Sequence, residues 1–225
     1  MRVRSTILGC LAVAVLASSG AHAAPKPQVT DIANDANGTN FQGVSPALSN
    51  RPTPVGSQAY ADILAVTWSA VKKGKKVTGF SVTAKLSAAP TPLAGTSLVY
   101  RVLGTTSRCG FFGVAYYTSK SSDPKIPQSA VRDNCIAETT RLTAIPLPKI
   151  SGSTITWTVP FTAIPKDTKV GLGTKLTDLR MTVHEIEDFR VACFPTAVPT
   201  YGGSCGLGAG MLDDAVTTAT YTLGK

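Results

Sequence analysis

A cluster of short polar residues near the start of the chain could bind a metal ion. In the stretch TDIANDANGTNFQG, oxygen-bearing side chains crowd around a glycine that permits a sharp turn: Asp31, Asp35, Asn37, Gly38 and Asn40. Calcium takes about six to eight hard oxygen ligands from carboxylates, amides and carbonyls. The spacing is not that of an EF-hand, because no acid stands where the bidentate ligand should be. The alternative is a set of Asx turns, in which these side chains satisfy local backbone donors.

A second group that could do chemistry surrounds His184. The stretch HEIED places His184 directly before Glu185, and Asp178 lies earlier in the same apolar-polar run. A histidine beside carboxylates could act as a general acid or base, or could bind a metal. The competing interpretation is a solvated strand end, because few other chemistry-bearing residues accompany this group. The small extracellular enzyme that this group suggests is therefore kept as an alternative.

The first residues predict export. Arg2 and Arg4 form a basic start, the run ILGCLAVAVLA is too short to anchor in a bilayer, and AHA at 21–23 fits a cleavage site. We therefore expect residues 1–23 to be a signal peptide and the mature protein to be secreted. No later apolar run has the length of a membrane-spanning helix, so no transmembrane segment is expected.

Four cysteines remain after the predicted cleavage, and an even number in an exported chain predicts two disulfides. Three pairings are possible. The local pairs Cys109–Cys135 and Cys193–Cys205 are favoured because each would enclose one loop-rich segment. A zinc site is the rival interpretation, but the chain has no C-x-x-C pair and few histidines.

Alternation of apolar and polar residues predicts strands from Ala61 onward. In ADILAVTW, the side chains of Leu64, Val66 and Trp68 should share one face. The same two-residue period is found in three later groups, namely Phe80, Val82, Ala84 and Leu86, then Ile155, Trp157 and Val159, and then Leu179, Met181 and Val183.

These elements must position the candidate site residues. About eight to nine strands and no long amphipathic helix predict an all-β protein, a single antiparallel, jelly-roll-like β-sandwich with long disulfide-tied loops. Residues 24–58 are expected to form an irregular polar lead-in segment, and 59–225 the sandwich. We expect 119–135 to be a polar loop. TRLTAIPLP and SGSTITWTVPF should pair around the turn KISGS.

The charge of the chain favours anionic partners. Without the two arginines of the predicted signal, twenty basic residues face thirteen acidic ones, which gives the mature chain a net charge of +7. A basic exported protein associates loosely with acidic polysaccharide or anionic wall polymer, and the stronger competing interpretation is that this charge mainly keeps the protein soluble. No interleaving of arginines with aromatic residues suggests specific nucleic-acid recognition, and a monomer is expected.

The pattern Asp31-x-x-x-Asp35-x-x-Gly38, followed by Asp62 at the opening of an alternating strand, resembles a known family. It is similar to the start of family-9-type carbohydrate-binding and DOMON-like β-sandwich modules of exported actinobacterial proteins. The resemblance covers Asp31 to about Leu86. It implies a jelly-roll sandwich and a structural calcium, with Asp31, Asp35 and Asp62 as its acids. The tryptophan pair that grips sugar in the binding modules has no evident counterpart.

Together these features predict a non-catalytic secreted sandwich for extracellular binding or surface interaction, with carbohydrate or cell-wall polymer as the ligand class. The metal-site residues are taken to be Asp31, Asp35, Asn37 and Asp62, with structural calcium as the cofactor. Besides the enzyme around His184, a second alternative is a secreted protease inhibitor that presents the Pro-bearing loop between Cys193 and Cys205.

Overall fold

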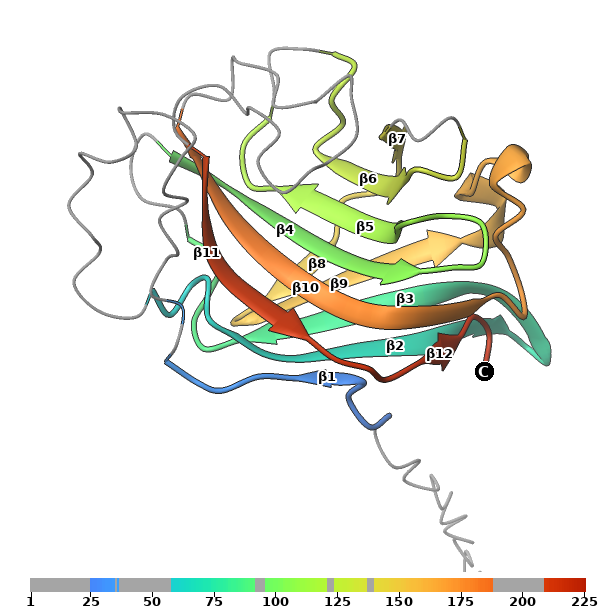
Figure 1. Cartoon of the computed structure of the whole chain (residues 1–225), viewed down its shortest axis with the longest axis horizontal. Helices are drawn as coiled ribbons and strands as arrows, with labels where there is room; N and C mark the ends of the chain where they lie inside the picture. Colours follow the sequence, from blue (N-terminus) through green and yellow to red (C-terminus); the bar gives the residue numbers. More distant parts are fainter. Residues whose placement is uncertain are drawn as a thin grey trace, which may run out of the picture.

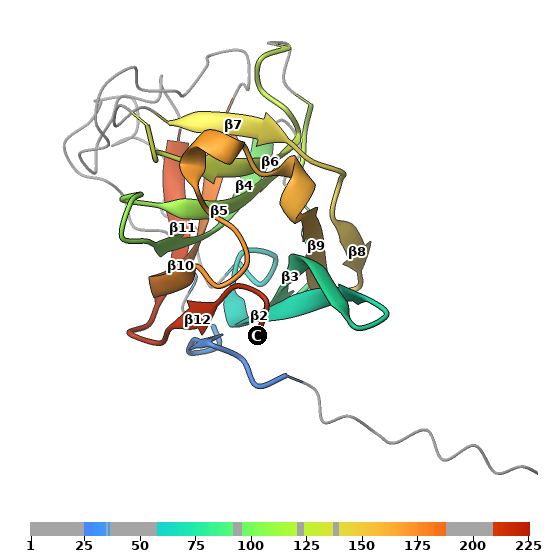
Figure 2. The same cartoon turned by 90° about the vertical axis from the view of Figure 1, so that its right-hand side faces the viewer.

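The computed structural model describes residues 25–34, 36, 58–91, 96–120, 124–136, 140–187 and 209–225. These residues form two antiparallel sheets, of five and seven strands, that pack against each other as a sandwich (Figure 1). Figure 2 shows the two sheets as separate layers. The fold class expected from the alternation of apolar residues is therefore confirmed.

The five-stranded sheet contains the early strands of the chain and one later hairpin. Its order is β1-β2-β3-β9-β8. A charged two-residue turn at Gly74 joins its two longest strands, and Gly74 has a φ of 61° that favours glycine. The strands are β1 (Val29–Thr30), β2 (Ile63–Lys73), β3 (Lys76–Leu86), β8 (Lys149–Ser151) and β9 (Thr154–Pro160).

The seven-stranded sheet has the order β11-β10-β4-β5-β6-β7, and β12 pairs with β10 beside this path. Two short 3-10 turns, η1 (Phe161–Ala163) and η2 (Lys166–Thr168), lie on the connection from β9 to β10. The strands are β4 (Thr96–Thr105), β5 (Phe112–Tyr117), β6 (Ser129–Asp133), β7 (Arg141–Ala144), β10 (Lys175–Glu187), β11 (Ala209–Val216) and β12 (Tyr221–Thr222).

The core lies between the two sheets and is built on the predicted alternation. Trp68 stacks on Phe80 with ring centroids 5.4 Å apart, and Tyr221 of β12 approaches the same tryptophan at 6.0 Å. Trp157 is also fully buried. Large aromatic side chains contribute much of the apolar area that stabilises a core of this size. The inward positions predicted on β3, β9 and β10 are confirmed, because every one of them is buried.

One inward position was predicted wrongly. Leu64 is only half-buried, whereas Ile63 is completely buried and takes its place in the core. The cause is a shift in the pairing of β2 with β3 between Ile63 and Ala65. A bulge of this kind adds one residue to a strand and reverses the faces on its two sides, so a strict two-residue period fails there.

The region from 119 to 160 also differs from the expectation. The stretch 119–135 is not only a loop, because it contains β6. The stretch TRLTAIPLP does not pair with the strand after the KISGS turn. Its first part is β7, which pairs with β6 in the seven-stranded sheet, and the turn instead joins β8 to β9 in the other sheet. The short strands β1, β7, β8 and β12 bring the number of strands among the described residues to twelve.

The lead-in segment contributes to the sandwich where the structure describes it. Val29 and Thr30 pair with Val66 and Ala65 of β2, and Val29 and Ala36 are fully buried. The segment is therefore not irregular throughout. No helix in the described ranges is long and apolar enough to cross a membrane.

Candidate functional site

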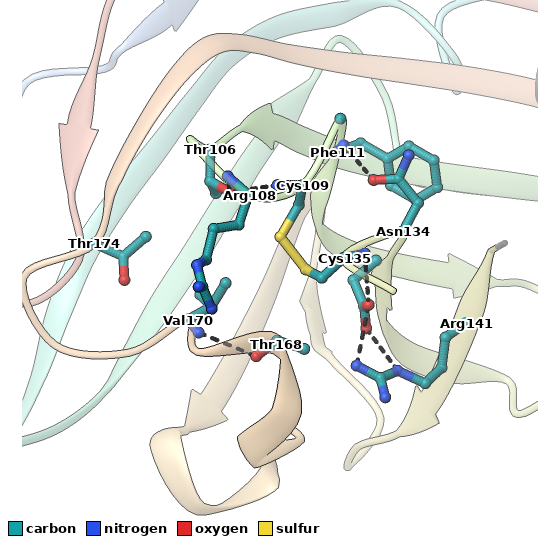
Figure 3. The surroundings of a disulfide bond; sticks show 12 residues. Thr106, Arg108, Cys109, Phe111, Asn134, Cys135, Arg141, Thr168, Val170 and Thr174 are labelled. Carbon is teal, nitrogen blue, oxygen red and sulfur yellow. Dashed lines mark hydrogen bonds and ion pairs between the residues drawn. A yellow bond between two sulfur atoms is a disulfide. The ribbon is translucent and has the colours of Figure 1, made fainter. Parts of the chain in front are cut away.

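The disulfide Cys109–Cys135 is present, as predicted (Figure 3). It joins the turn between β4 and β5 to the residues after β6, across a sequence separation of 26. The hydroxyl of Thr106 accepts the backbone N–H of Cys109 at 2.9 Å, and the side-chain oxygen of Asn134 accepts that of Phe111 at 2.7 Å. The disulfide therefore lies in a turn that is also fixed by side-chain hydrogen bonds. The second predicted pair, Cys193–Cys205, lies outside the described residues.

A buried ion pair adjoins this disulfide. Arg141 donates from Nε and Nη2 to the two carboxylate oxygens of Asp133, both at 3.1 Å, and Asp133 is fully buried. Arg141 also donates to Asp167 at 2.7 Å, and this hydrogen bond is the main reason why the pKa of Arg141 is raised. Figure 3 shows Arg141 beside the disulfide. The group has a structural explanation, because it holds β7 against η2 and β6.

Asp62 fixes the polar turn near the start of the chain. It is fully buried directly before β2. Both of its carboxylate oxygens lie 2.9 Å from the backbone nitrogen of Asn34, and the hydroxyl of Ser87 donates to Oδ2. Asn34 has a φ of 71°, a conformation that asparagine adopts more readily than most residues. Asp62 therefore joins the 31–36 turn to the end of β3.

A second buried carboxylate, that of Asp213, binds the backbone of the residue that follows Asp62. It stands on β11, is 7% exposed, and accepts the backbone N–H of Ile63 at 2.7 Å. Its other oxygen accepts the N–H of Asp214 at 2.9 Å. Asp213 pairs with the core residue Val183, so it occupies an inward position. The sequence analysis did not select Asp213. The available signal was an acid on the inward side of the apolar run in MLDDAV.

The residues proposed for calcium are only partly described. Asp31 directly follows β1 and donates its backbone N–H to Leu64 O at 3.2 Å, so its backbone lies beside the start of β2. Asp35 and Asn37 lie outside the described residues. Within the described ranges, no three acidic, histidine or cysteine side chains are grouped closely enough to bind a metal. Asp31 and Asp62 offer the hard carboxylate oxygens that calcium prefers, but with Asp213 they do not form such a group.

The structure does not bring Asp178 to His184. Asp178 is exposed at a break in the pairing of β10 with β4, with a φ of 48°. It lies six residues before His184, which corresponds to about 20 Å along a strand. The side chain of Glu185 is not among those described. His184 therefore lacks Asp178 as a catalytic partner.

Cationic groups surround His184 instead. Its pKa is held well below the usual value, first by burial and then by the positive charges of Arg101, Arg132 and Arg180. Because a nearby positive charge disfavours a protonated imidazole, His184 is neutral at physiological pH. These arginines and His184 stand on the side of the seven-stranded sheet that faces away from the core, called here the outer face.

The outer face is partly covered by apolar residues. Val99, Ala115, Tyr117 and Ile126 form a second buried cluster there, and Leu142 packs against it. Both sides of β5 are therefore buried, with Tyr116 in the main core and Tyr117 in the outer cluster. Both tryptophans are buried in the core, so neither provides an exposed stacking surface for a sugar.

Comparison with known proteins gives no relative. No family model, no curated protein and no solved structure matches the chain. The candidate site therefore has to be interpreted from its own residues.

Proposed function

We propose that this protein is a secreted, non-catalytic β-sandwich that binds a polymer outside the cell, either a polysaccharide or an anionic wall polymer. The observation that carries the proposal is the gathering of Arg101, Arg132, Arg180 and His184 on one face of a sheet. Side chains on strands are held more precisely than side chains on loops. With the net charge of +7 expected for the mature chain, this face attracts polyanions.

Secretion is part of the proposal. The disulfide Cys109–Cys135 supports it, because disulfides persist mainly in oxidising compartments. The basic start, apolar run and AHA site of residues 1–23 agree with this location.

Structural calcium is also part of the proposal, with Asp31, Asp35, Asn37 and Asp62 as ligands. Its support is that Asp62 accepts the backbone N–H of Asn34, close in sequence to Asp31, and that Asp213 accepts the N–H of the residue after Asp62. Bound calcium would neutralise the acids and fix the turn. The likeness to family-9-type and DOMON-like modules is proposed for the fold and this turn rather than for a sugar-gripping tryptophan pair, because Trp68 and Trp157 are buried.

The enzyme hypothesis around His184 has less support. Asp178 lies far from His184 along β10. The pKa of His184 is lowered mainly by burial and then by the charges of three arginines. A general base must take up a proton, and positive surroundings oppose the protonated imidazole. Such an environment therefore suits recognition of negative charge better than general base catalysis. The inhibitor loop of 193–205 lies outside the described residues.

Co-sedimentation tests the proposed function. The secreted protein is mixed at about 0.15 M salt, where surface charges are screened beyond ~8 Å, with insoluble pectate, with cell walls that bear teichoic acid and with neutral cellulose. We expect retention on at least one of these polymers that persists at this salt. Binding to all of them that is seen only well below this salt concentration would indicate bare charge attraction and would contradict the proposal, as would absence of retention.

A further inference from the structure

The arginines of the outer face occupy adjacent positions fixed by strand register. Arg101 on β4 lies opposite Thr182 on β10, and Arg180 and His184 are two residues to either side of Thr182. Diagonal neighbours on one face of an antiparallel pair lie about 7–8 Å apart. Arg101 therefore lies between Arg180 and His184, its two diagonal neighbours on β10.

Small residues separate Arg101 from Arg132. Across β5 and β6, Arg101 is in line with Ala115 and then Ala130, and Arg132 lies opposite Gly113. No long side chain occupies the positions between the two guanidinium-bearing residues. Gly113 is required there, because a Cβ atom would come within 1.9 Å of the carbonyl oxygen of Val102. The sheet between Arg101 and Arg132 therefore carries only glycine and alanine at these positions.

Arg101 has a hydrogen-bond donor that the protein does not use. Its Nε is buried and has no hydrogen-bond partner, although the side chain as a whole is only half-buried. A buried unsatisfied donor is costly, and a guanidinium matches two oxygens of a carboxylate or phosphate. An oxyanion at this position would satisfy the donor. Arg132 is held in place nearby, over the ring of Phe111 at 5.2 Å.

A carboxylate among the described side chains also lies on this face. It belongs to Asp214 on β11, which lies opposite Thr182 and is influenced by Arg180. Burial raises the pKa of Asp214, so its negative charge is disfavoured. Arg101 therefore lies on the same face as other cationic groups, which also favour a bound anion.

An apolar cluster borders these arginines. Ala115 lies beside Arg101 and belongs to the cluster of Val99, Tyr117 and Ile126, which is buried on the outer face. Figure 1 shows β10, β4, β5 and β6 side by side as the strands that carry both groups. An apolar wall next to a cationic group suits an anion attached to an organic body, such as an acidic sugar or a phosphodiester.

We propose that the outer face of the seven-stranded sheet binds an oxyanion, phosphate or carboxylate, beside Arg101. The claim that this site recognises a polymer rests on the proposed function. The claim that the site binds a small anion does not depend on the proposed function.

The test uses inorganic phosphate as the probe. Isothermal calorimetry and melting temperature are measured on the secreted protein with phosphate and with chloride at equal ionic strength. We expect binding and a rise in melting temperature of several degrees with phosphate, and loss of both in Arg101→Gln. Lys85→Gln is the matched control, because it removes one exposed charge from the other sheet and should leave both unchanged.

Two outcomes would overturn the site. One is absence of phosphate binding by the wild type, and the other is equal binding by Arg101→Gln. If Arg101→Gln does not fold, arginine modification of the wild type decides the matter. Phosphate should protect Arg101 from phenylglyoxal, as mapped by mass spectrometry, and unprotected modification contradicts the site.

Measurements with two polymers show whether the ligand is a carboxylate or a phosphodiester. They also distinguish failure of the anion site from failure of the proposed function. Polygalacturonate presents carboxylates and teichoic acid presents phosphodiesters, so weakening by Arg101→Gln on only one polymer identifies the source. Retention on polymer that Arg101→Gln does not weaken would remove this site and leave the proposed function standing. Phosphate binding at Arg101 without polymer retention would keep the site and remove that function.

Discussion

Asp213 and Ile63 are 150 positions apart in sequence and are joined by a 2.7 Å hydrogen bond from the backbone N–H of Ile63 to the Asp213 carboxylate. Asp213 stands on the seven-stranded sheet, and Ile63 begins β2 in the five-stranded sheet. This hydrogen bond therefore connects the two layers at the side where Asp62 holds the 31–36 turn. It makes Asp213 a structural residue whatever else that turn does.

Removing the Asp213 carboxylate should destabilise the sandwich. Asp213→Ala leaves the buried N–H of Ile63 without its acceptor, which costs about 1–3 kcal/mol. Asp213→Asn keeps a carbonyl oxygen in the same place and should cost less. Urea unfolding measures both, with Asp178→Asn as a control that should change little, because Asp178 is exposed and asparagine tolerates its left-handed backbone. Equal stability of Asp213→Ala and wild type would contradict this role.

Loss of the Cys109–Cys135 disulfide should lower stability by ~3.5 kcal/mol, as the loop-entropy estimate gives for a closed loop of this length. For a domain of this size the melting temperature should fall by about 10 °C. The double variant Cys109→Ala/Cys135→Ala, measured beside the wild type in guanidinium chloride, provides the comparison. Peptide mapping without reductant should recover residues 109 and 135 in one cross-linked fragment. A free thiol at either position would contradict the structure.

The stability of the protein should decrease in mild acid because of His184. Burial and the three arginines place its pKa well below the usual value, whereas in the unfolded chain it titrates near ~6.5. Between these two pKa values the unfolded chain binds more protons, so the His184 contribution is fully favourable above about pH 6.5 and is lost as the pH falls toward the folded pKa. Denaturation from about pH 7.5 to pH 5 measures this loss.

The variant His184→Gln is the control for that pH dependence, and it should flatten the fall in stability below about pH 6.5. His22 lies in the predicted signal peptide, so the mature chain would have one imidazole to follow by NMR. Its titration midpoint should lie well below that of a free histidine. Added phosphate should raise the midpoint if the anion binds beside Arg101. A midpoint at or above the ordinary value would contradict the cationic surroundings of His184.

Calcium should stabilise the protein if the turn of Asp31 and Asp35 holds it. A ligand at a hundred times its dissociation constant adds about 2.7 kcal/mol, which corresponds to several degrees for a domain of this size. We expect the melting temperature in excess calcium to exceed that in EDTA, and Asp35→Ala to abolish the difference. Equal melting temperatures for the wild type would make the turn an Asx cluster held by Asp62.

Most of the fold could be predicted from local pattern. Alternation placed Phe80, Trp157 and Met181 in the core because a sheet with one buried face requires a two-residue period. It failed at Leu64, where a bulge reverses the faces and the sequence carries no signal for it. It also failed at Arg141–Ala144, which crosses to the other sheet, because short strands carry too few residues to show a period.

The candidate site was less predictable, because it depends on which strands become neighbours. The early turn and Asp62 could be connected through the family resemblance, and the structure brings Asn34 to Asp62. Asp213 could not be connected, since its partner Ile63 comes from the far end of the chain. Likewise, Arg101 and Arg132 have no distinctive local sequence. Only the order β10-β4-β5-β6 places them on one face with His184.

The central claim is that the outer face recognises anionic polymer through Arg101, and paired affinity measurements test it most directly. Dissociation constants for polygalacturonate and for teichoic acid are measured with the wild type, Arg101→Gln and Lys85→Gln at about 0.15 M salt, where exposed charges are largely screened. We predict that Arg101→Gln weakens binding to at least one polymer about tenfold, equivalent to ~1.4 kcal/mol, while Lys85→Gln matches the wild type. Equal weakening by the two variants would show that net charge alone attracts the polymer and would contradict the claim.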